Sequence, residues 1–265
     1  MRSIRVTSLA LGGLVLLSGP VLAAETLRKE TPPEPDQVVQ RMCDYLKSLN
    51  QFSYRAEVTD DRVYSGGKKL QYAFELETFV ERPNKLRVNA EGDRVDKQFF
   101  YDGKTLTLYS PAAKVYATVE APPEIEGALE KADKDLKLRV ALADLASPKL
   151  CEHLAKGQRH ALSVGPSRVR GVPTDHLAFD RNDIQFQVWI ETGPKPLPRK
   201  IVITQKNLPA SPQWTAVLQD WNVSPPLKPG LFTFEAPAGV RKIKFVSVQP
   251  PAAPVPAIPP AKTGG

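Results

Sequence analysis

Short segments in which apolar and polar side chains alternate place the strongest constraint on how this chain can fold. The clearest spans 183–191, where apolar side chains recur at every second position: Ile184, Phe186, Val188 and Ile190. About ten further segments have strand character and lie at 52–64, 69–81, 85–90, 94–101, 104–110, 114–119, 161–164, 171–179, 199–206 and 214–221. Few helical stretches separate them, so consecutive strands are expected to pair antiparallel. The pattern predicts an α+β protein with one large twisted antiparallel sheet.

Two regions are expected to be helical. Asp36 is a suitable N-cap for a helix with one apolar stripe, formed by Val38, Val39, Met42, Cys43, Leu46 and Leu49. A second helical region is expected at 136–156, broken at Ser147 and Pro148, where serine can cap and proline can begin a new turn. Helices packed against one side of a twisted sheet define its concave face.

Cys43 and Cys151 are the only cysteines, and each falls in one of these helical regions. An oxidising compartment would let them form a disulfide that joins the two helices. Such a bond would contribute roughly 4 to 5 kcal/mol to stability in the chain-entropy model. The alternative is two thiols that are buried separately.

The stretch FFYDGKTLTLYSP, which begins at Phe99, places an acidic residue, a glycine and a lysine in a row. Asp-Gly between two β-rich runs favours a two-residue hairpin, in which Tyr101 faces Lys104 and Phe99 faces Leu106. Phe99, Tyr101 and Leu106 then share one face of the sheet. A phosphate-binding loop would need a longer glycine-rich segment before a helix, so Asp102 is interpreted as a turn residue.

The N-terminus has the layout of a signal peptide over 1–23. Arg2 and Arg5 precede an apolar run that is too short to span a bilayer, and small residues follow it. Cleavage there predicts an exported, periplasmic protein with no transmembrane segment in its mature form. The formal charge of +7 loses two arginines and becomes +5. Because the remaining basic residues are scattered among acids, no nucleic-acid partner is expected.

The rest of the chain is expected to contain one folded domain. Residues 24–35 are charged and rich in proline, which predicts a flexible segment, and 36–248 form the domain itself. The tail at 249–265 is rich in proline and alanine and has no aromatic residue. It is expected to be disordered because it cannot bury enough surface to fold.

No arrangement of residues in the sequence points to catalysis, to a metal ion or to another cofactor. The histidines lie at 153, 160 and 176, and no second pair of metal ligands accompanies them. His176 has no serine in a nucleophile elbow to activate. A hydrolase whose catalytic residues converge only in the fold is a third functional hypothesis, behind the two given below.

The predicted concave face carries large apolar side chains that could line a site for a hydrophobic ligand. These candidates are Phe99, Tyr101, Leu106, Ile184, Phe186, Val188, Ile190 and Trp214. Burial of a saturated chain contributes about 0.8 kcal/mol per methylene group, so such a site needs no catalytic residue. The alternative is that helices fill the concavity and these residues are simply core.

Four blocks of the sequence resemble one known family: ERPNKLRV (81–88), FFYDGKTLTLYSP (99–111), IQFQVWIETG with PLPRKIVIT (184–204), and FTFEAPAGVRKIKF (232–245). Their order and spacing are similar to those of the predicted periplasmic proteins known as domain of unknown function 2092. That family is similar in turn to the bacterial lipoprotein carrier and the outer-membrane lipoprotein receptor. The resemblance implies that the sheet curls into an incomplete β-barrel, with helices covering its concave side, and that acyl chains bind inside it in the carriers.

Two functional hypotheses follow. The leading one is a non-enzymatic periplasmic protein that binds a lipid or a lipoprotein acyl chain in the concavity of the half-barrel. The alternative is an interaction or sensor module of the cell envelope, which binds a protein partner through the sheet edge or the tail. Neither hypothesis requires a cofactor.

Overall fold

The computed structural model describes residues 34–245. The predicted signal peptide at 1–23, nearly all of the segment at 24–35 and the tail at 249–265 lie outside the described residues. Those three predictions, and the boundaries of the domain between them, therefore stay predictions.

The described residues form one large open sheet. Its twelve strands follow the order β12-β6-β5-β4-β3-β2-β1-β11-β10-β9-β8-β7. They are β1 (Gln51–Val63), β2 (Lys69–Glu81), β3 (Lys85–Gly92), β4 (Asp96–Tyr101), β5 (Thr105–Ser110), β6 (Val115–Glu120), β7 (His160–Val169), β8 (Val172–Asp180), β9 (Ile184–Glu191), β10 (Pro198–Gln205), β11 (Gln213–Asn222) and β12 (Arg241–Lys242). All neighbours pair antiparallel except β12 and β6. The predicted fold class is confirmed.

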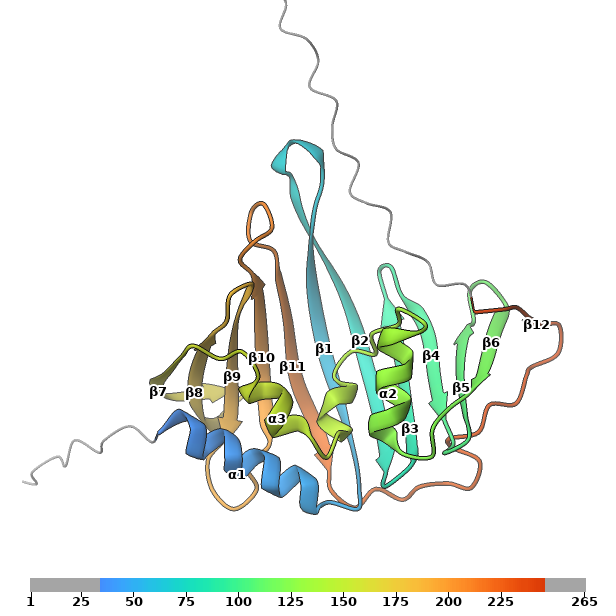
Figure 1. The fold of residues 1–265 in the computed structure, drawn as a ribbon, viewed down its shortest axis with the longest axis horizontal. Coiled ribbons are helices and arrows are strands. Elements are labelled where there is room, and N and C mark those ends of the chain that lie inside the picture. The colour runs from blue at the N-terminus through green and yellow to red at the C-terminus, as the bar shows by residue number, and fades with distance from the viewer. Residues whose placement is uncertain (1–33, 246–265) are drawn as a thin grey trace, which may run out of the picture. The chain divides into compact units, whose positions relative to one another are not determined.

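The helices lie together against one face of this sheet (Figure 1). They are α1 (Pro35–Ser48), α2 (Ile125–Lys134), the short 3-10 helix η2 (Ala143–Ala146) and α3 (Leu150–Ala155). We call these four elements the lid, and the sheet face beneath them the concave face. A further 3-10 helix, η1 (Ser65–Gly67), lies at the far end of the long β1–β2 hairpin.

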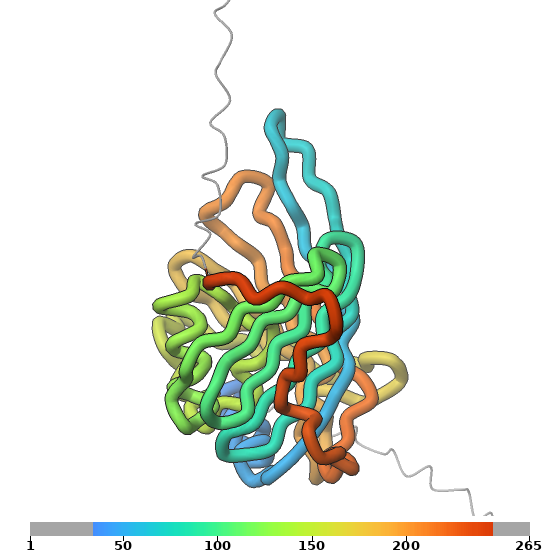
Figure 2. Tube along the Cα trace, turned by 90° about the vertical axis from the view of Figure 1, so that its right-hand side faces the viewer, coloured from blue at the N-terminus to red at the C-terminus, as the bar shows by residue number. Residues whose placement is uncertain are grey.

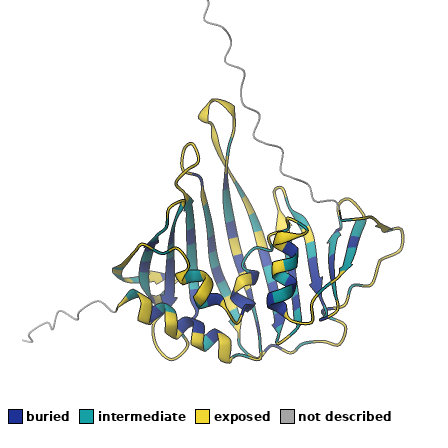
Figure 3. Ribbon diagram, in the orientation of Figure 1, coloured by how far each residue is buried: buried dark blue, intermediate teal, exposed yellow. Residues whose placement is uncertain are grey.

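The hydrophobic core lies between the lid and the concave face. Alternate residues of β1 point into it, and Phe52, Tyr54, Ala56 and Val58 are each at most 1% exposed. From α1 the core receives Val38, Met42, Cys43 and Leu46, the apolar stripe predicted for this helix. Figure 3 shows the buried residues on the strands behind the helices, with more exposed residues toward the strand ends above them.

The lid helices differ from the prediction at their boundaries. α1 begins at Pro35, so Asp36 lies in its first turn instead of capping it. α2 begins well before the second predicted helical region, because Ile125, Ala128 and Ala132 give a short apolar stripe that the prediction missed. Residues 135–142 are not helical. The predicted break at Ser147 is present, since its hydroxyl accepts a hydrogen bond from the backbone N–H of Lys149 (3.0 Å).

The β4–β5 hairpin pairs two residues out of step with the prediction. Tyr101 faces Leu106 and Phe99 faces Leu108, so the predicted pairing of Tyr101 with Lys104 was wrong. A shift of two residues leaves every side chain on its original face. Phe99, Tyr101 and Leu106 therefore share the concave face as predicted.

The Asp102 side chain explains why this turn is longer than two residues. Its carboxylate accepts hydrogen bonds from the backbone N–H groups of Lys104 (2.9 Å) and Thr105 (2.8 Å). Only Gly103 takes a positive φ, of 90°. Such a turn is stabilised by the aspartate side chain rather than by two left-handed residues. Asp102 is a turn residue, as predicted.

The C-terminal part of the described chain packs on the opposite, outer face of the sheet. Figure 2 shows this segment crossing the strands β3 to β6. Phe234 anchors it against Phe100, Tyr109 and Tyr116, with ring centroids 4.9 to 5.4 Å apart. The segment ends by adding β12 to the edge of β6, so that β7 is the one long strand left at an edge of the described sheet.

Candidate ligand-binding site

The concave face carries all the side chains that the sequence proposed as ligand lining, but in two separate groups. Phe99, Tyr101 and Leu106 lie on β4 and β5 and are at most 3% exposed. The other group lies on β9 and β11 and consists of Ile184, Phe186, Val188, Ile190 and Trp214. In the strand order, β1, β2 and β3 separate the two groups. The structure therefore joins the β9 and β11 residues and leaves the first group apart.

The first group is packed core. The Tyr101 hydroxyl donates a hydrogen bond to the carbonyl oxygen of Pro122, 2.6 Å away, just before α2. Burial raises the pKa of Tyr101 to about 12, so this hydroxyl stays a donor over the physiological range. Over this half of the sheet the lid fills the concavity.

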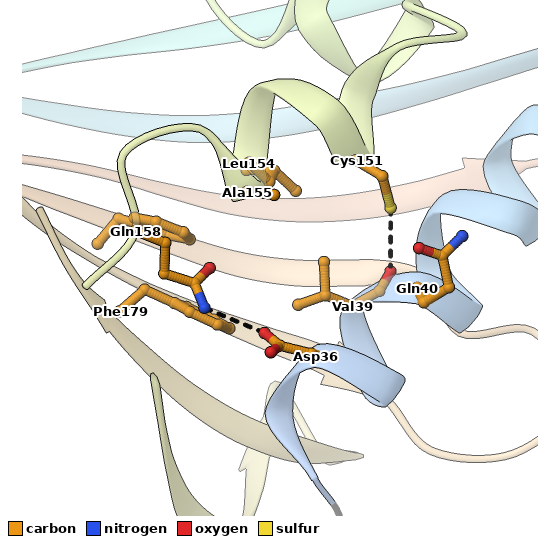
Figure 4. Close-up of a pocket in the computed structure, with 9 residues that line it drawn as sticks. Asp36, Val39, Gln40, Cys151, Leu154, Ala155, Gln158 and Phe179 are labelled. Atoms are coloured by element: carbon orange, nitrogen blue, oxygen red, sulfur yellow. Dashed lines mark hydrogen bonds between the residues drawn. The ribbon is translucent and has the colours of Figure 1, made fainter. Parts of the chain in front are cut away.

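A pocket remains over the second group, between α1, α3 and the strands β8 and β9 (Figure 4). Its volume is about 290 Å³. The lining is Asp36, Val39, Gln40, Cys151, Leu154, Ala155, Gln158, Phe179 and Phe186. Phe186 is thus the one proposed lining residue that reaches this pocket. Its ring stacks on that of Phe179, with centroids 4.7 Å apart and planes 13° apart.

Polar groups bridge the pocket between α1 and the segment that follows α3. Asp36 Oδ1 accepts a hydrogen bond from Gln158 Nε2 (3.1 Å), and Figure 4 shows this contact in front of the Phe179 ring. Asp36 was predicted to cap α1, and its carboxylate instead joins two parts of the pocket wall. The bridge is exposed, so it can break at little cost.

A row of cross-strand partners extends from the pocket along the concave face. Phe179 faces Phe186 on β9, Phe186 faces Ile203 on β10, and Ile203 faces Trp214 on β11. Ile203 and Trp214 are only partly buried. The pocket floor therefore continues as a partly buried apolar surface toward the middle of the sheet.

A disulfide ties the two helices that flank the pocket. Cys43 of α1 and Cys151 of α3 are joined, with their Cα atoms 5.8 Å apart. The predicted bond is confirmed. The bond limits how far α1 and α3 can separate over the pocket.

Arg82 connects the sheet to the C-terminal end of α1 and to η2. Its guanidinium group donates hydrogen bonds to the carbonyl oxygens of Leu49 (3.1 Å) and Leu46 (3.2 Å), where α1 ends, and to that of Ala146 in η2. Burial lowers the pKa of Arg82, but arginine remains charged at any physiological pH. One side chain therefore satisfies carbonyl groups of two lid elements.

Arg181 performs the same task at the pocket. It lies in the turn between β8 and β9 and donates to the carbonyl oxygens of His153 (2.8 Å) and Leu154 (2.7 Å) near the end of α3. Its guanidinium group also lies 5.2 Å from the centroid of the Phe186 ring. Arg181 thus fixes α3 above the floor of the pocket.

A buried carboxylate connects the remaining lid elements. Glu126 of α2 is 8% exposed and accepts a hydrogen bond from the Ser147 hydroxyl. Its other oxygen lies 3.3 Å from Nε2 of His153 on α3. Ser147 and His153 both contact Glu126, but they do not contact each other. His153 is therefore not placed to activate the Ser147 hydroxyl as a nucleophile. We interpret this cluster as a structural connection within the lid.

Sequence reasoning did not assign these lid contacts. Arg82 lies in the block ERPNKLRV (81–88), which contributed only to the family resemblance. The available clue was the arginine itself, since a charged side chain at the start of a buried strand needs partners. Arg181 and Glu126 gave no comparable signal, because their partners are distant in the sequence.

Neither a metal centre nor a membrane-spanning helix is found among residues 34–245. No group of three or more histidine, cysteine, aspartate or glutamate side chains there is arranged to hold a metal ion. None of the helices in that range is long and apolar enough to cross a membrane.

The sequence matches one protein family over residues 35–246, described as predicted periplasmic protein (DUF2092). The chain belongs to this family. The match covers the whole described sheet and lid, and it confirms both the resemblance found in the sequence and the periplasmic location. No curated protein sequence matches this member of the family.

Several solved structures are similar to this family member, all at low sequence identity. An uncharacterized conserved protein from Thermus thermophilus has a TM-score of 0.47 and 8% identity, with 78% of this chain and 97% of that chain covered. LprF from Mycobacterium bovis has a TM-score of 0.44 and 14% identity, with 76% and 100% covered. A LolA superfamily protein from Nitrosomonas europaea has a TM-score of 0.39 and 10% identity, with 76% and 98% covered.

Proposed function

We propose that this periplasmic protein binds a long acyl chain, of a lipid or of a lipoprotein, and that it does so without catalysis. The observation that carries the proposal is the pocket between α1, α3, β8 and β9, whose floor is the stacked pair Phe179 and Phe186. Apolar side chains from α1 and α3 complete it, and the partly buried row through Ile203 and Trp214 continues it. Of the lining residues proposed from the sequence, Phe186 and Trp214 contact the ligand, and Val188 and Ile190 belong to the buried core beside them.

The size of the pocket determines how the chain binds. A volume of about 290 Å³ is at the lower end for ligand sites, which typically measure roughly 300 to 1,000 Å³. The pocket therefore holds one end of an acyl chain, and the rest lies along the apolar row. Each buried methylene group contributes about 0.8 kcal/mol before ordering costs, so a partly buried chain still binds measurably.

Filling the pocket tests this proposal. Val39 lines it from α1 and is only partly buried, so Val39→Trp inserts an indole ring without enlarging the core. We expect native mass spectrometry to detect palmitate on the mature wild-type protein and at least tenfold less on the variant. Gln37→Trp adds the same ring to the exposed side of α1 and should leave binding unchanged. Equal palmitate binding by Val39→Trp and wild type contradicts the proposed site, and no binding by either contradicts the function.

The free edge of β7 favours a second candidate function, recognition of a protein partner by strand addition. Leu162 and Val164 on this edge are 61% and 52% exposed. An unpaired edge strand with exposed apolar side chains can pair with an extended segment of another chain.

Protein purified from its own cell envelope distinguishes the two functions. A bound lipid mass supports acyl binding. A stoichiometric protein partner that is lost with Leu162→Lys supports strand addition instead. Leu208→Lys, in a turn where the side chain is 52% exposed, is the matched control and should retain that partner.

A further inference from the structure

An arginine and two tyrosines gather beyond the end of the apolar row. Arg94, between β3 and β4, donates a hydrogen bond to the Tyr64 hydroxyl (2.7 Å), and its guanidinium group lies 4.9 Å from the centroid of the Tyr72 ring. The two hydroxyl oxygens are 2.8 Å apart. Tyr72 is on the same face of β2 as Phe74 and Leu76, which is the concave face. We call Arg94, Tyr64 and Tyr72 the rim cluster.

The positive charge of Arg94 is not neutralised by an ion pair with any residue in the range 34–245. Two carboxylates are nearby, and each has another partner. Asp93 accepts a hydrogen bond from the backbone N–H of Ala73 (2.8 Å). Asp60 on β1 pairs with Tyr72 on β2, and its Oδ2 forms an ion pair with the guanidinium group of Arg62 (2.6 Å). The rim cluster therefore offers a cation and two hydroxyl groups to an anionic ligand.

The two tyrosine hydroxyl groups share one hydrogen bond, which raises the pKa of Tyr64 and lowers that of Tyr72. The neighbouring tyrosines raise the pKa of Arg94, so the guanidinium group stays charged. Tyrosine hydroxyls can both donate to an anion and accept from arginine, so either one can turn from its present partner toward a ligand.

The rim cluster is in line with the pocket. Trp214 faces Asp60 on β1, and Asp60 faces Tyr72 on β2, which extends the row that begins at Phe179. From Phe179 to Trp214 the row crosses three strand spacings of roughly 4.8 Å, about 14 Å in all. One acyl chain spans half of a bilayer core of about 30 Å, or about 15 Å. Tyr72 lies two strand spacings beyond Trp214, so Phe186 and Tyr72 are four spacings, roughly 19 Å, apart along the row. An acyl chain of about 15 Å together with its head group spans most of that distance, with the tail over Trp214 and Ile203 and its end at Phe186.

We propose that the rim cluster binds the acidic head group of a single-chain amphiphile whose tail lies along the row and ends at Phe186, on the near side of the pocket. The inference rests on the proposed acyl-binding function and adds the head group and the orientation. A carboxylate or a phosphate monoester fits, because each presents oxygens that accept charge-assisted hydrogen bonds from guanidinium and hydroxyl donors. Neutral head groups lack this interaction.

Two ligands with the same tail test the head group. We expect wild-type mature protein to bind palmitate about tenfold more tightly than hexadecanol, measured by calorimetry at low ionic strength and neutral pH. Arg94→Gln should weaken palmitate binding about tenfold and leave hexadecanol binding unchanged. Arg55→Gln is the matched control, because Arg55 is on the outer face of β1 with a side chain that is 60% exposed. It should change neither affinity.

The outcomes separate the inference from the function on which it rests. If wild type binds both ligands equally, or if Arg94→Gln binds palmitate as wild type does, the rim cluster is not the head-group site, although acyl binding stands. If wild type binds neither ligand, the proposed function itself fails. Palmitoyl lysophosphatidate distinguishes the two acidic groups. If it binds more tightly than palmitate and Arg94→Gln abolishes this difference, the rim cluster is a phosphate site. If it binds more weakly than palmitate, the rim cluster is a carboxylate site.

Discussion

The hydroxyl group of Tyr54, in the middle of the sheet, donates a hydrogen bond to the backbone carbonyl oxygen of Leu142, 3.0 Å away in the lid. Tyr54 is 1% exposed, and burial raises the pKa of its hydroxyl well above the ordinary value, so it remains a donor. Leu142 has a left-handed backbone, with a φ of 60°, immediately before η2. The centre of the sheet therefore fixes the path of the lid.

Tyr54→Phe is expected to destabilise the protein by about 1 to 2 kcal/mol, because it leaves the Leu142 carbonyl without its buried donor. For a domain of this size the melting temperature falls by roughly 4 °C. Thermal unfolding followed by circular dichroism measures the change. Tyr45→Phe is the control, since the Tyr45 hydroxyl makes no hydrogen bond to another residue in 34–245. An equal effect of both substitutions would contradict a specific role for the contact.

Arg82→Met is expected to cost more, about 3 kcal/mol. The variant keeps an apolar stem of similar length but removes the donors to Leu46, Leu49 and Ala146. Arg82→Lys retains the charge without the planar guanidinium group and should recover only part of the loss. Urea unfolding measures both. Full recovery by lysine would mean that charge alone, rather than hydrogen bonding to the lid, explains the effect.

Reduction of the bond between Cys43 and Cys151 is expected to lower the melting temperature by roughly 10 °C. The bond spans 108 residues, and closing a loop of that size restricts the unfolded chain by about 4 to 5 kcal/mol in the chain-entropy model. Differential scanning calorimetry with and without reductant measures the shift. The double variant Cys43→Ala with Cys151→Ala should reproduce the reduced value and no longer respond to reductant. A melting temperature that reductant leaves unchanged in wild type argues against the bond.

Most of the sheet could be predicted from the sequence, because strand character is local. The alternation from Ile184 to Ile190 predicted both the strand and the face that points to the core. In the β4–β5 hairpin the predicted pairing was wrong by two residues, which left every side chain on the correct face. α2 was missed because its apolar stripe is short and rich in alanine, which packs well under a helix but gives a weak signal.

The candidate site was less predictable, because its parts meet only through long-range contacts. The sequence indicated Phe186 and Trp214 as lining, but it could not show that β10 places Ile203 between them. Nor could it show that α2 closes the concavity over Tyr101 while α1 and α3 leave a pocket. Spacing predicts which face a side chain occupies, whereas the volume above that face depends on how distant helices pack.

Asp61, a buried carboxylate on the outer face of β1, lies near the turn of the β1–β2 hairpin and holds this part of it in place. Its oxygens accept hydrogen bonds from the backbone N–H of Gln213 (3.0 Å) and from Gln71 Nε2 (3.1 Å), and Lys69 Nζ lies 3.2 Å away. Burial acts to raise the pKa of Asp61, but these hydrogen bonds and the lysine charge together hold it below its ordinary value. The folded protein therefore binds this proton less tightly than the unfolded chain does.

This difference predicts that the stabilisation by Asp61 is present above the ordinary carboxyl pKa of about 3.9 and is lost as pH falls through the lower folded value. Asp61→Asn should therefore destabilise the protein at pH 7 by about 2 kcal/mol, since the amide accepts fewer of these bonds and carries no charge. The deficit should shrink as the pH falls below the ordinary value, because the unfolded wild-type chain then binds a proton that the folded carboxylate, with its lower pKa, does not yet bind. Melting temperatures from neutral to acidic pH measure it. Asp183→Asn, in the exposed turn before β9, is the control and should follow wild type throughout. A deficit for Asp61→Asn that is the same at every pH would mean that the side chain acts through packing and not through its charge.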